Sequence, residues 1–212
     1  MVKKVKLTRP ELKRYRDALA RYERFLPTLK LKQQQLQVSL REVAAQRRKA
    51  ERAVDEIVAA IKQYRRVLAD RAGIPLETWS RPLEVKTSPA NIAGVEIRVF
   101  EDVVFPPAQY SLFGTPPWVD QALIDLREQS RREAVAEVLR QEESLLRSEL
   151  ERIIQRVNLF EKVMIPNARD AIRRIRIRLG DEMTAAVGRA KIAKNKLAET
   201  LSTEPLDEGN EP

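Results

Sequence analysis

The 212-residue chain contains no cysteine and no histidine, and these two absences exclude several kinds of chemistry. Without them the chain cannot build a disulfide, a thiol nucleophile, a histidine general base or a zinc site with cysteine or histidine ligands. Aromatic residues make up only 5% of the chain, so the large side chains that fill globular cores are scarce. Glycines are also few, at six. We therefore do not expect an isolated enzyme, and we assign no catalytic residue.

Several motifs are missing as well. The glycine-rich patterns of phosphate loops and dinucleotide-binding turns, and the Gly-x-Ser-x-Gly elbow, do not occur. The acidic pairs Glu142-Glu143 and Asp181-Glu182 are expected to be surface charge and not a metal or acid-base site. No apolar run approaches the ~20 residues of a membrane-spanning helix, and the basic start at residues 1–8 has no apolar segment behind it. The sequence predicts a soluble, cytoplasmic, helix-rich protein without cofactor or metal, and the absence of cysteine fits a reducing compartment.

Charge is abundant but unevenly spread, with 40 Lys and Arg against 31 Asp and Glu. Residues 199–212 hold five acids and no base, together with prolines and a glycine, and are predicted to form a disordered acidic tail. The rest of the chain is therefore more basic than the overall net charge of +9. A basic surplus can indicate nucleic-acid binding, but here the cations alternate with glutamates, as on solvated helix faces.

The first long segment, residues 9–70, repeats apolar side chains every seven positions. It opens with Thr8-Arg9-Pro10-Glu11, a capping box with proline in the first turn, and Gly73 and Pro75 follow its end. Only Gln33 and Arg47 are polar in the repeat, here called the N-terminal seam: Leu12, Tyr15, Leu19, Tyr22, Leu26, Leu29, Gln33, Leu36, Leu40, Val43, Arg47, Ala50, Val54, Ile57, Ile61, Tyr64 and Leu68. Such sustained spacing predicts a left-handed coiled coil with its tyrosines in the core, a rod of roughly 90 Å.

The second long segment, residues 118–198, carries a comparable repeat, here called the C-terminal seam. Its clear part is Leu146, Leu150, Ile153, Val157, Phe160, Met164, Ala168, Ile172, Ile175, Leu179, Met183, Ala186, Ala190, Ala193 and Leu197. Consecutive steps of four around Pro166 predict a stutter that locally unwinds the supercoil. Pro166, like Pro27 in the first segment, is expected to kink its helix. The small residues near the C-terminus predict closely approaching helices and a slim tip.

Two such helices in one chain most simply pair with each other in antiparallel orientation. Equal rise along both helices then predicts which residues lie level. Arg47 should lie opposite residues 143–148, where Glu143 could neutralise it. Pro27 should lie opposite residues 163–168, a window that contains Pro166. The predicted fold is mainly α, a long antiparallel two-helix coiled coil with a small insert.

The insert, residues 71–117, is rich in proline and has the only β-like alternation in the chain. It lies in Leu83-Glu84-Val85-Lys86 and in residues 95–100, with Asn91-Ile92-Ala93-Gly94 as turn material between. We predict a short β-hairpin that projects sideways from the end of the rod. A connector of this length exceeds what two antiparallel helices need, so a docking role is favoured over simple closure of the helical hairpin.

Two motifs resemble those of the D-subunit family of V/A-type (vacuolar/archaeal-type) ATPases. The run Arg156-Val157-Asn158-Leu159-Phe160-Glu161-Lys162-Val163-Met164-Ile165-Pro166 is similar to the family's Arg-Val-Asn-Ala-Leu-Glu followed by Ile-Pro, with Leu159 and Phe160 as departures. Asn91, Gly94 and Val95 match its Asn-x-x-Gly-Val stretch. At the N-terminus the match is poorer, because Leu7-Thr8-Arg9-Pro10 and Leu29-Lys30-Leu31-Lys32-Gln33-Gln34 depart from the family's usual patterns.

The resemblance implies the central rotor stalk of a proton- or sodium-translocating rotary ATPase or ATP synthase, a non-catalytic component that binds no nucleotide. It implies the A and B subunits of the catalytic hexamer as partners, with the F subunit and the C subunit (d in eukaryotes) near the insert. The complex would lie on the cytoplasmic face of the membrane, and the chain would touch the membrane only through it. Possible contacts to the catalytic ring are the basic residues Lys3, Lys4, Arg9, Arg189, Lys191, Lys194 and Lys196.

Two other functions fit the residues alone. A basic coiled coil could bind nucleic acid, which would show as a steep salt dependence of affinity. A structural scaffold could dimerise through the heptads, and sedimentation would separate that dimer from an elongated monomeric hairpin.

Overall fold

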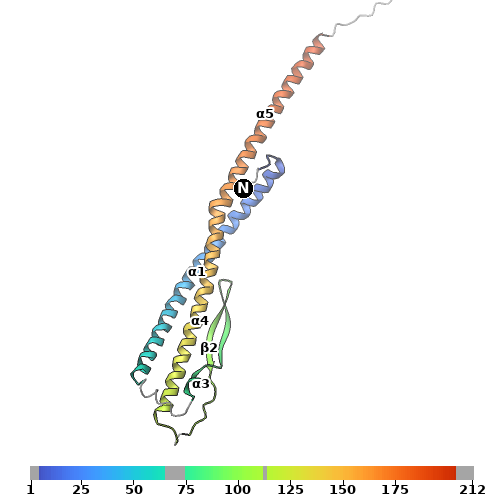
Figure 1. The fold of residues 1–212 in the computed structure, drawn as a ribbon. Coiled ribbons are helices and arrows are strands. Elements are labelled where there is room, and N and C mark those ends of the chain that lie inside the picture. Colours follow the sequence, from blue (N-terminus) through green and yellow to red (C-terminus); the bar gives the residue numbers. More distant parts are fainter. Residues whose placement is uncertain (1–4, 65–74, 112–113, 204–212) are drawn as a thin grey trace, which may run out of the picture. The chain divides into compact units, whose positions relative to one another are not determined.

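A computed structural model describes residues 5–64, 75–111 and 114–203 (Figure 1). Long helices occupy both ends of this range, and a two-stranded antiparallel sheet lies between them in sequence. The elements in chain order are α1 (Arg9–Gln63), α3 (Leu76–Ser80), β1 (Glu84–Ile92), β2 (Val95–Val104), α4 (Trp118–Leu159), the π-helical turn η1 (Phe160–Met164) and α5 (Ile165–Thr203). This order confirms the predicted fold class of long N- and C-terminal helices around a small β-hairpin.

The chain divides into two compact units. The first, here called the terminal unit, combines the first 28 residues with residues 157 onward; the second, the hairpin unit, comprises residues 29–156. α1 therefore contributes its first turns to the terminal unit and the remainder to the hairpin unit.

The helix α1 follows the predicted heptads. Its first backbone hydrogen bond runs from the Leu12 N–H to the Thr8 carbonyl oxygen at 3.0 Å, and Pro10 lies in the first turn, where its missing N–H breaks no bond. Every residue of the N-terminal seam from Leu12 to Tyr64 is buried or half-buried. The apolar repeat thus faces a partner helix along the whole of α1. Residues 65–74 lie outside the described residues, and with them Leu68, the predicted end of the segment at residue 70, and Gly73.

In the hairpin unit, α1 packs antiparallel to α4 across a thin apolar core. Its buried side chains include Leu36 and Val43 on α1 and Leu146 and Ile153 on α4. Arg132 of α4 donates a hydrogen bond to the Ala53 carbonyl oxygen of α1 at 2.9 Å. Backbone and seam contacts together hold the two helices in one register.

The β-hairpin of this unit closes in a tight two-residue turn. Ile92 pairs with Val95, so Ala93 and Gly94 form the loop, and both have positive φ, 51° and 78°. Positive φ at both positions is the signature of a type I′ turn, whose twist matches that of the strands. The Gly94 N–H donates to the Asn91 side-chain oxygen at 2.8 Å. The predicted turn material therefore forms the turn.

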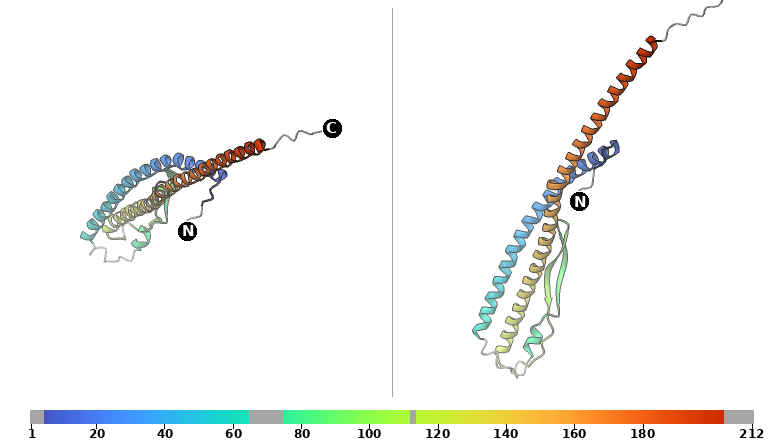
Figure 2. Two further views of the ribbon diagram at one scale, coloured as in Figure 1. Left: turned by 90° about the horizontal axis from the view of Figure 1, so that it is seen from above. Right: turned by 45° about the horizontal axis from the view of Figure 1, so that its top comes forward.

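The hairpin lies along α4 instead of projecting sideways, so the predicted direction was wrong (Figure 2). At its open end, Asp102 of β2 forms an ion pair with Arg131 of α4 at 2.9 Å. At its tip, a side chain on Gly94 would come within 3.4 Å of the Lys32 ammonium on α1, and that ammonium pairs with Glu149 of α4 at 3.8 Å. Ile97 of β2 is only 3% exposed. Burial of the strand's apolar residues explains why the hairpin does not extend into solvent.

The segment before α4 is fastened by one arginine. The Arg127 guanidinium donates to the carbonyl oxygens of Trp79 at 3.1 Å and Pro106 at 2.6 Å, and lies 5.3 Å from the centre of the Phe105 ring. Trp79 in turn stacks on Tyr110 at 5.8 Å. These contacts seat the ends of the insert on the first turns of α4.

In the terminal unit, the start of α1 packs against η1 and α5. The Tyr22 and Phe160 rings lie 5.3 Å apart, Glu23 and Arg169 form an ion pair at 2.7 Å, and Ile172 and Ile175 are buried. Leu12 lines one hollow with Leu179, whereas Glu23 pairs with Arg169, so the two helices run antiparallel, as the seam predicts.

The C-terminal seam stops short of its predicted end. Leu179 is half-buried, but every residue from 180 to 199 is exposed, including Ala186, Ala190 and Ala193. The prediction of a close helix pair at this tip was therefore wrong. The start of α1 explains the difference, since Arg9 and Leu12 line one hollow with Leu179 and Met183, so α1 begins level with the last buried seam residues. α5 continues to Thr203, so residues 199–203 are helical and not disordered, while residues 204–212 lie outside the described residues.

The π-helical turn coincides with the predicted stutter. The Ile165 N–H donates to the Phe160 carbonyl oxygen, five residues back, and Pro166 follows without an N–H to donate. A π-turn holds more residues than an α-turn, which accommodates the steps of four through Phe160, Met164 and Ala168. Pro27 lies inside the continuous helix α1, and kinks at the two prolines stay a prediction.

Candidate functional site

The exposed end of α5 carries most of the cations predicted to contact a partner. Residues 180–199 form a helical stretch with every side chain exposed, and Arg189, Lys191, Lys194 and Lys196 lie within it. Apolar side chains share this stretch, with Val187 69% and Ile192 59% exposed. A contiguous exposed apolar patch is typical of a surface that another protein covers. Arg9 lies apart from them at the start of α1, and Lys3 and Lys4 lie outside the described residues.

The family-motif residues divide between core and surface. Val157 and Ile165 are buried at 6% and 7% exposure, whereas Arg156, Asn158, Glu161 and Pro166 are exposed. Asn91, Gly94 and Val95 form or flank the hairpin turn. The motif around η1 therefore supplies seam contacts on one side of the helix and a polar surface on the other.

A charged network crosses the seam of the hairpin unit where Arg47 interrupts the apolar repeat. The Arg47 guanidinium pairs with Glu143 of α4 and with Glu51 of its own helix, both at 2.5 Å. Glu143 also pairs with Arg147 at 2.9 Å, and Arg140 reaches Glu51 at 3.5 Å. The predicted neutralisation of Arg47 by Glu143 is confirmed. A polar group in a coiled-coil seam fixes register, because sliding would leave a buried charge without its partner.

The pKa values of Arg47 and of the neighbouring Glu142 are both raised in this part of the hairpin unit. Hydrogen bonds from Arg47 to Glu143 and Glu51 raise the pKa of Arg47, so the guanidinium stays charged. Glu142 and Glu143 are only 7% and 8% exposed, so the prediction that they are surface charge was wrong. Burial raises the pKa of Glu142 above its ordinary value. The other acidic pair, Asp181 and Glu182, is exposed as predicted.

Tyr64 closes the far end of the helix pair in the hairpin unit. Its hydroxyl donates to the Asp125 carboxylate of α4, and burial with this carboxylate raises its pKa well above the usual range. The phenol therefore stays protonated and keeps its hydrogen bond. Tyr15 and Tyr22 are half-buried in the terminal unit, so the seam tyrosines serve packing, as predicted.

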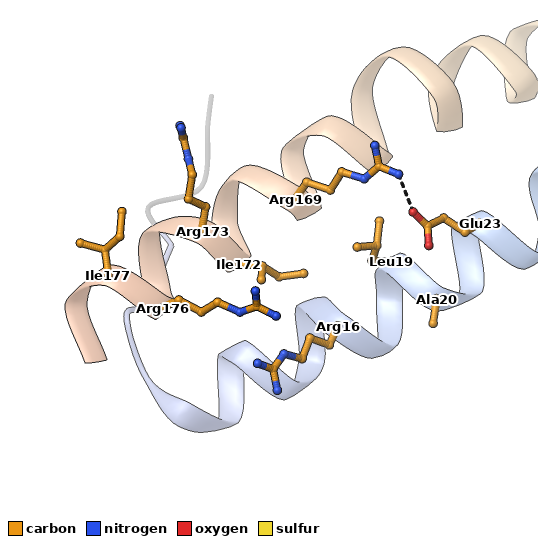
Figure 3. A pocket seen from close by; sticks show the side chains of 9 residues that line it. All are labelled: Arg16, Leu19, Ala20, Glu23, Arg169, Ile172, Arg173, Arg176 and Ile177. Atoms are coloured by element: carbon orange, nitrogen blue, oxygen red, sulfur yellow. Dashed lines mark hydrogen bonds and ion pairs between the residues drawn. The ribbon is translucent and has the colours of Figure 1, made fainter. Parts of the chain in front are cut away.

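A basic groove in the terminal unit was missed by the sequence reasoning. It is an open hollow of about 530 Å³ between α1 and α5 (Figure 3). It is lined by Arg16, Arg169, Arg173 and Arg176, by Glu23, and by Leu19, Ala20, Ile172 and Ile177. A second hollow, of about 600 Å³, shares Arg16 and extends along Leu12, Leu179 and Met183. A sequence pattern could have indicated this groove, because arginines directly follow seam residues on both helices: Arg16 follows Tyr15, and Arg176 follows Ile175.

Within ranges 5–64, 75–111 and 114–203, no three acidic side chains gather in a way that could hold a metal ion. None of the helices in these ranges combines the length and the apolar character needed to cross a membrane. These described ranges offer a pair of long helices, an exposed cationic helix end and a basic groove.

Comparison with known proteins gives consistent matches over nearly the whole chain. Residues 11–195 match the family of the ATP synthase D subunit. The chain is 36% identical over 194 residues to the V-type ATP synthase D subunit of Borreliella burgdorferi, covering 92% of this chain and 95% of that protein. It is 34% identical to the protein of the same description from Chlamydia pneumoniae, over 91% of this chain and 93% of that one. The Chlamydia muridarum protein is 35% identical, with 93% and 98% covered.

Proposed function

Because the chain belongs to the family of the ATP synthase D subunit, we propose that it is the non-catalytic central shaft of a rotary V/A-type ATPase or ATP synthase. In this role it transmits torque between a catalytic hexamer of A and B subunits and the ion-translocating ring in the membrane. The observation that most supports this role is the pair of long antiparallel helices, bonded to each other through seam contacts in both units. A shaft needs no reacting groups of its own.

Torque transmission requires that the two helices neither slide nor separate. In the hairpin unit, the Arg47–Glu143 ion pair and the bond from Arg132 to the Ala53 carbonyl oxygen resist axial sliding. In the terminal unit, the Glu23–Arg169 ion pair does the same. Apolar seam residues add the attraction that resists separation. Each unit therefore has apolar contacts that resist separation of the helices and polar contacts that resist sliding, as a shaft under load needs.

We assign ring contact to the exposed end of α5 and the start of α1. At the end of α5 the apolar side chains and the cations Arg189, Lys191 and Lys194 are presented together, which suits a protein surface with acidic and apolar residues. Lys196, Arg9, Lys3 and Lys4 belong to the same proposed contact. The hairpin unit would bind the F subunit and the C subunit (d in eukaryotes), which would link the shaft to the membrane ring at the cytoplasmic face.

The nucleic-acid alternative is weakened by how the arginines are used. Many of them pair with acids of the same chain, as Arg47 does with Glu143 and Arg140 with Glu137. A phosphate-binding surface would instead leave such guanidiniums available.

Co-purification from the native cell tests the proposal. A tagged full-length chain should recover the A and B subunits. A variant that ends at residue 183 keeps the buried seam, which reaches Leu179, and should recover less of the A and B subunits while retaining the F subunit. Failure of the full-length chain to recover A and B subunits would refute the shaft role, and equal recovery by the shortened variant would refute the assigned contact.

A further inference from the structure

The basic groove of the terminal unit contains charges that its own chain leaves uncompensated. Arg169 pairs with Glu23 at 2.7 Å, and Arg173 pairs with Asp170 at 2.8 Å. Among the described residues, neither Arg16 nor Arg176 has an acidic partner. Both line the groove from opposite helices, and Figure 3 shows their guanidinium groups pointing toward each other. Two facing cations repel each other, so an anion placed between them would bind favourably.

The apolar part of the groove indicates what kind of anion fits. Leu19 and Ile172 line it between the arginines, and Ile177 at its edge is 59% exposed. A small inorganic anion would use the arginines and leave this apolar surface in water. A protein segment with a carboxylate beside apolar side chains would use both, since a guanidinium binds a carboxylate through two parallel hydrogen bonds and burial of the isoleucine adds hydrophobic stabilisation.

The acidic C-terminal tail of the same chain cannot be this segment. α5 continues from Arg176 to Thr203, which is about 40 Å of helix. The remaining residues, 204–212, span at most about 30 Å even when extended. Residues 204–212 therefore cannot reach the groove, and a segment of another protein is the occupant that we consider.

We propose that the basic groove is a docking site for an acidic, partly apolar segment of one of the proteins in the surrounding catalytic ring, with its carboxylate held between Arg16 and Arg176. This inference rests on the proposed shaft function and adds a defined contact to it. The groove lies where α1 still accompanies α5, so the contact is separate from that of the exposed helix end. A ring segment seated here would grip both helices at once.

Charge reversal tests the contact quantitatively. We compare the full-length chain with the double variant Arg16→Glu/Arg176→Glu and with the control Arg24→Glu/Lys162→Glu. The control makes the same change in net charge at exposed positions of the same unit, outside the groove lining. Binding to a purified complex of A and B subunits should weaken by about 10-fold or more in the groove variant, and by less than about threefold in the control. Equal weakening in both variants would overturn the proposal.

Cross-linking identifies the segment without disturbing the arginines. The chain has no cysteine, so Ala20→Cys places a single thiol in the groove lining, and Ser148→Cys places one on the exposed surface of the hairpin unit as control. A photoreactive maleimide at residue 20 should capture a peptide of the A or B subunits that contains Asp or Glu, and the control should not capture that peptide. Capture of only peptides without acidic residues, or no capture in an assembled complex, would overturn the proposal.

The outcomes separate this inference from the shaft function. If the wild-type chain fails to bind A and B subunits, the shaft function itself fails. If the wild-type chain binds and the groove variant binds equally well, only the docking site fails. Titration of the free chain with inorganic phosphate and with ATP should show no binding, and tight binding that Arg16→Glu/Arg176→Glu abolishes would assign the groove to a phosphate ligand instead.

Discussion

Two adjacent leucines on α4 provide a matched test of the seam. Leu146 is 0% exposed in the core of the hairpin unit, whereas Leu145 is 49% exposed. Truncation of a fully buried leucine removes its transfer free energy and leaves a cavity, for which about 2–5 kcal/mol is typical. The helix pair is thin and can partly close around the gap, so we expect Leu146→Ala to lower the free energy of unfolding by about 3 kcal/mol. For Leu145→Ala we expect less than about 1 kcal/mol, since half of its surface is already in water.

Thermal and urea unfolding followed by circular dichroism measure the difference. For a chain of this size, about 3 kcal/mol corresponds to a fall in the melting temperature of roughly 6–12 °C. Both variants replace leucine by alanine in the same helix, so helix propensity changes equally in the two. The difference between their free energies of unfolding therefore reports the burial of the side chain. Equal losses in the two variants would refute the assignment of Leu146 to the seam and, with it, the packing of α1 on α4.

Two further predictions concern ionisation and backbone strain. Burial raises the pKa of Glu142 above its ordinary value of 4.5, so the native state holds a proton more tightly than the unfolded state and stability declines as the pH rises from 4.5 through the raised value. Glu142→Gln should remove that decline, so its melting temperature should exceed that of the wild type by more at pH 7 than at pH 4. A pH profile of melting temperature that runs parallel to the wild type would contradict this. Ala93 has a φ of 51°, which asparagine tolerates better than alanine, so Ala93→Asn should stabilise the hairpin by about 0.5–1 kcal/mol. Hydrogen exchange of the β1 and β2 amides should then slow, and unchanged or faster exchange would argue against strain at the turn.

The sequence predicted the helix pair because heptad spacing and equal rise are local properties that need no knowledge of the rest of the fold. The opposition of Arg47 and Glu143 followed from them, as did the burial of the N-terminal seam. The turn was also local, since Asn91 and Gly94 are the residue types that a tight hairpin needs.

The features that were missed depend on where separate elements meet. The hairpin lies along α4 through contacts such as Asp102 with Arg131, and the pairing of residues so distant in sequence has no repeat that marks it. Glu142 and Glu143 are buried in the folded unit, whereas their sequence shows only two charges on a helix. The last turns of α5 have the apolar spacing of a helix pair in the sequence. Ala186 and Ala190 are nevertheless exposed, because α1 begins at Arg9, level with Leu179 and Met183.

Single-molecule rotation tests the central claim most directly. Because the chain has no cysteine, Arg98→Cys provides a single thiol on the exposed side of β2, to which a bead can be attached in a complex whose A and B subunits are fixed to a surface. The shaft function predicts that the bead turns in one direction when ATP is added and stops when ATP is removed. A bead that stays fixed relative to the A and B subunits during measured ATP hydrolysis would contradict it.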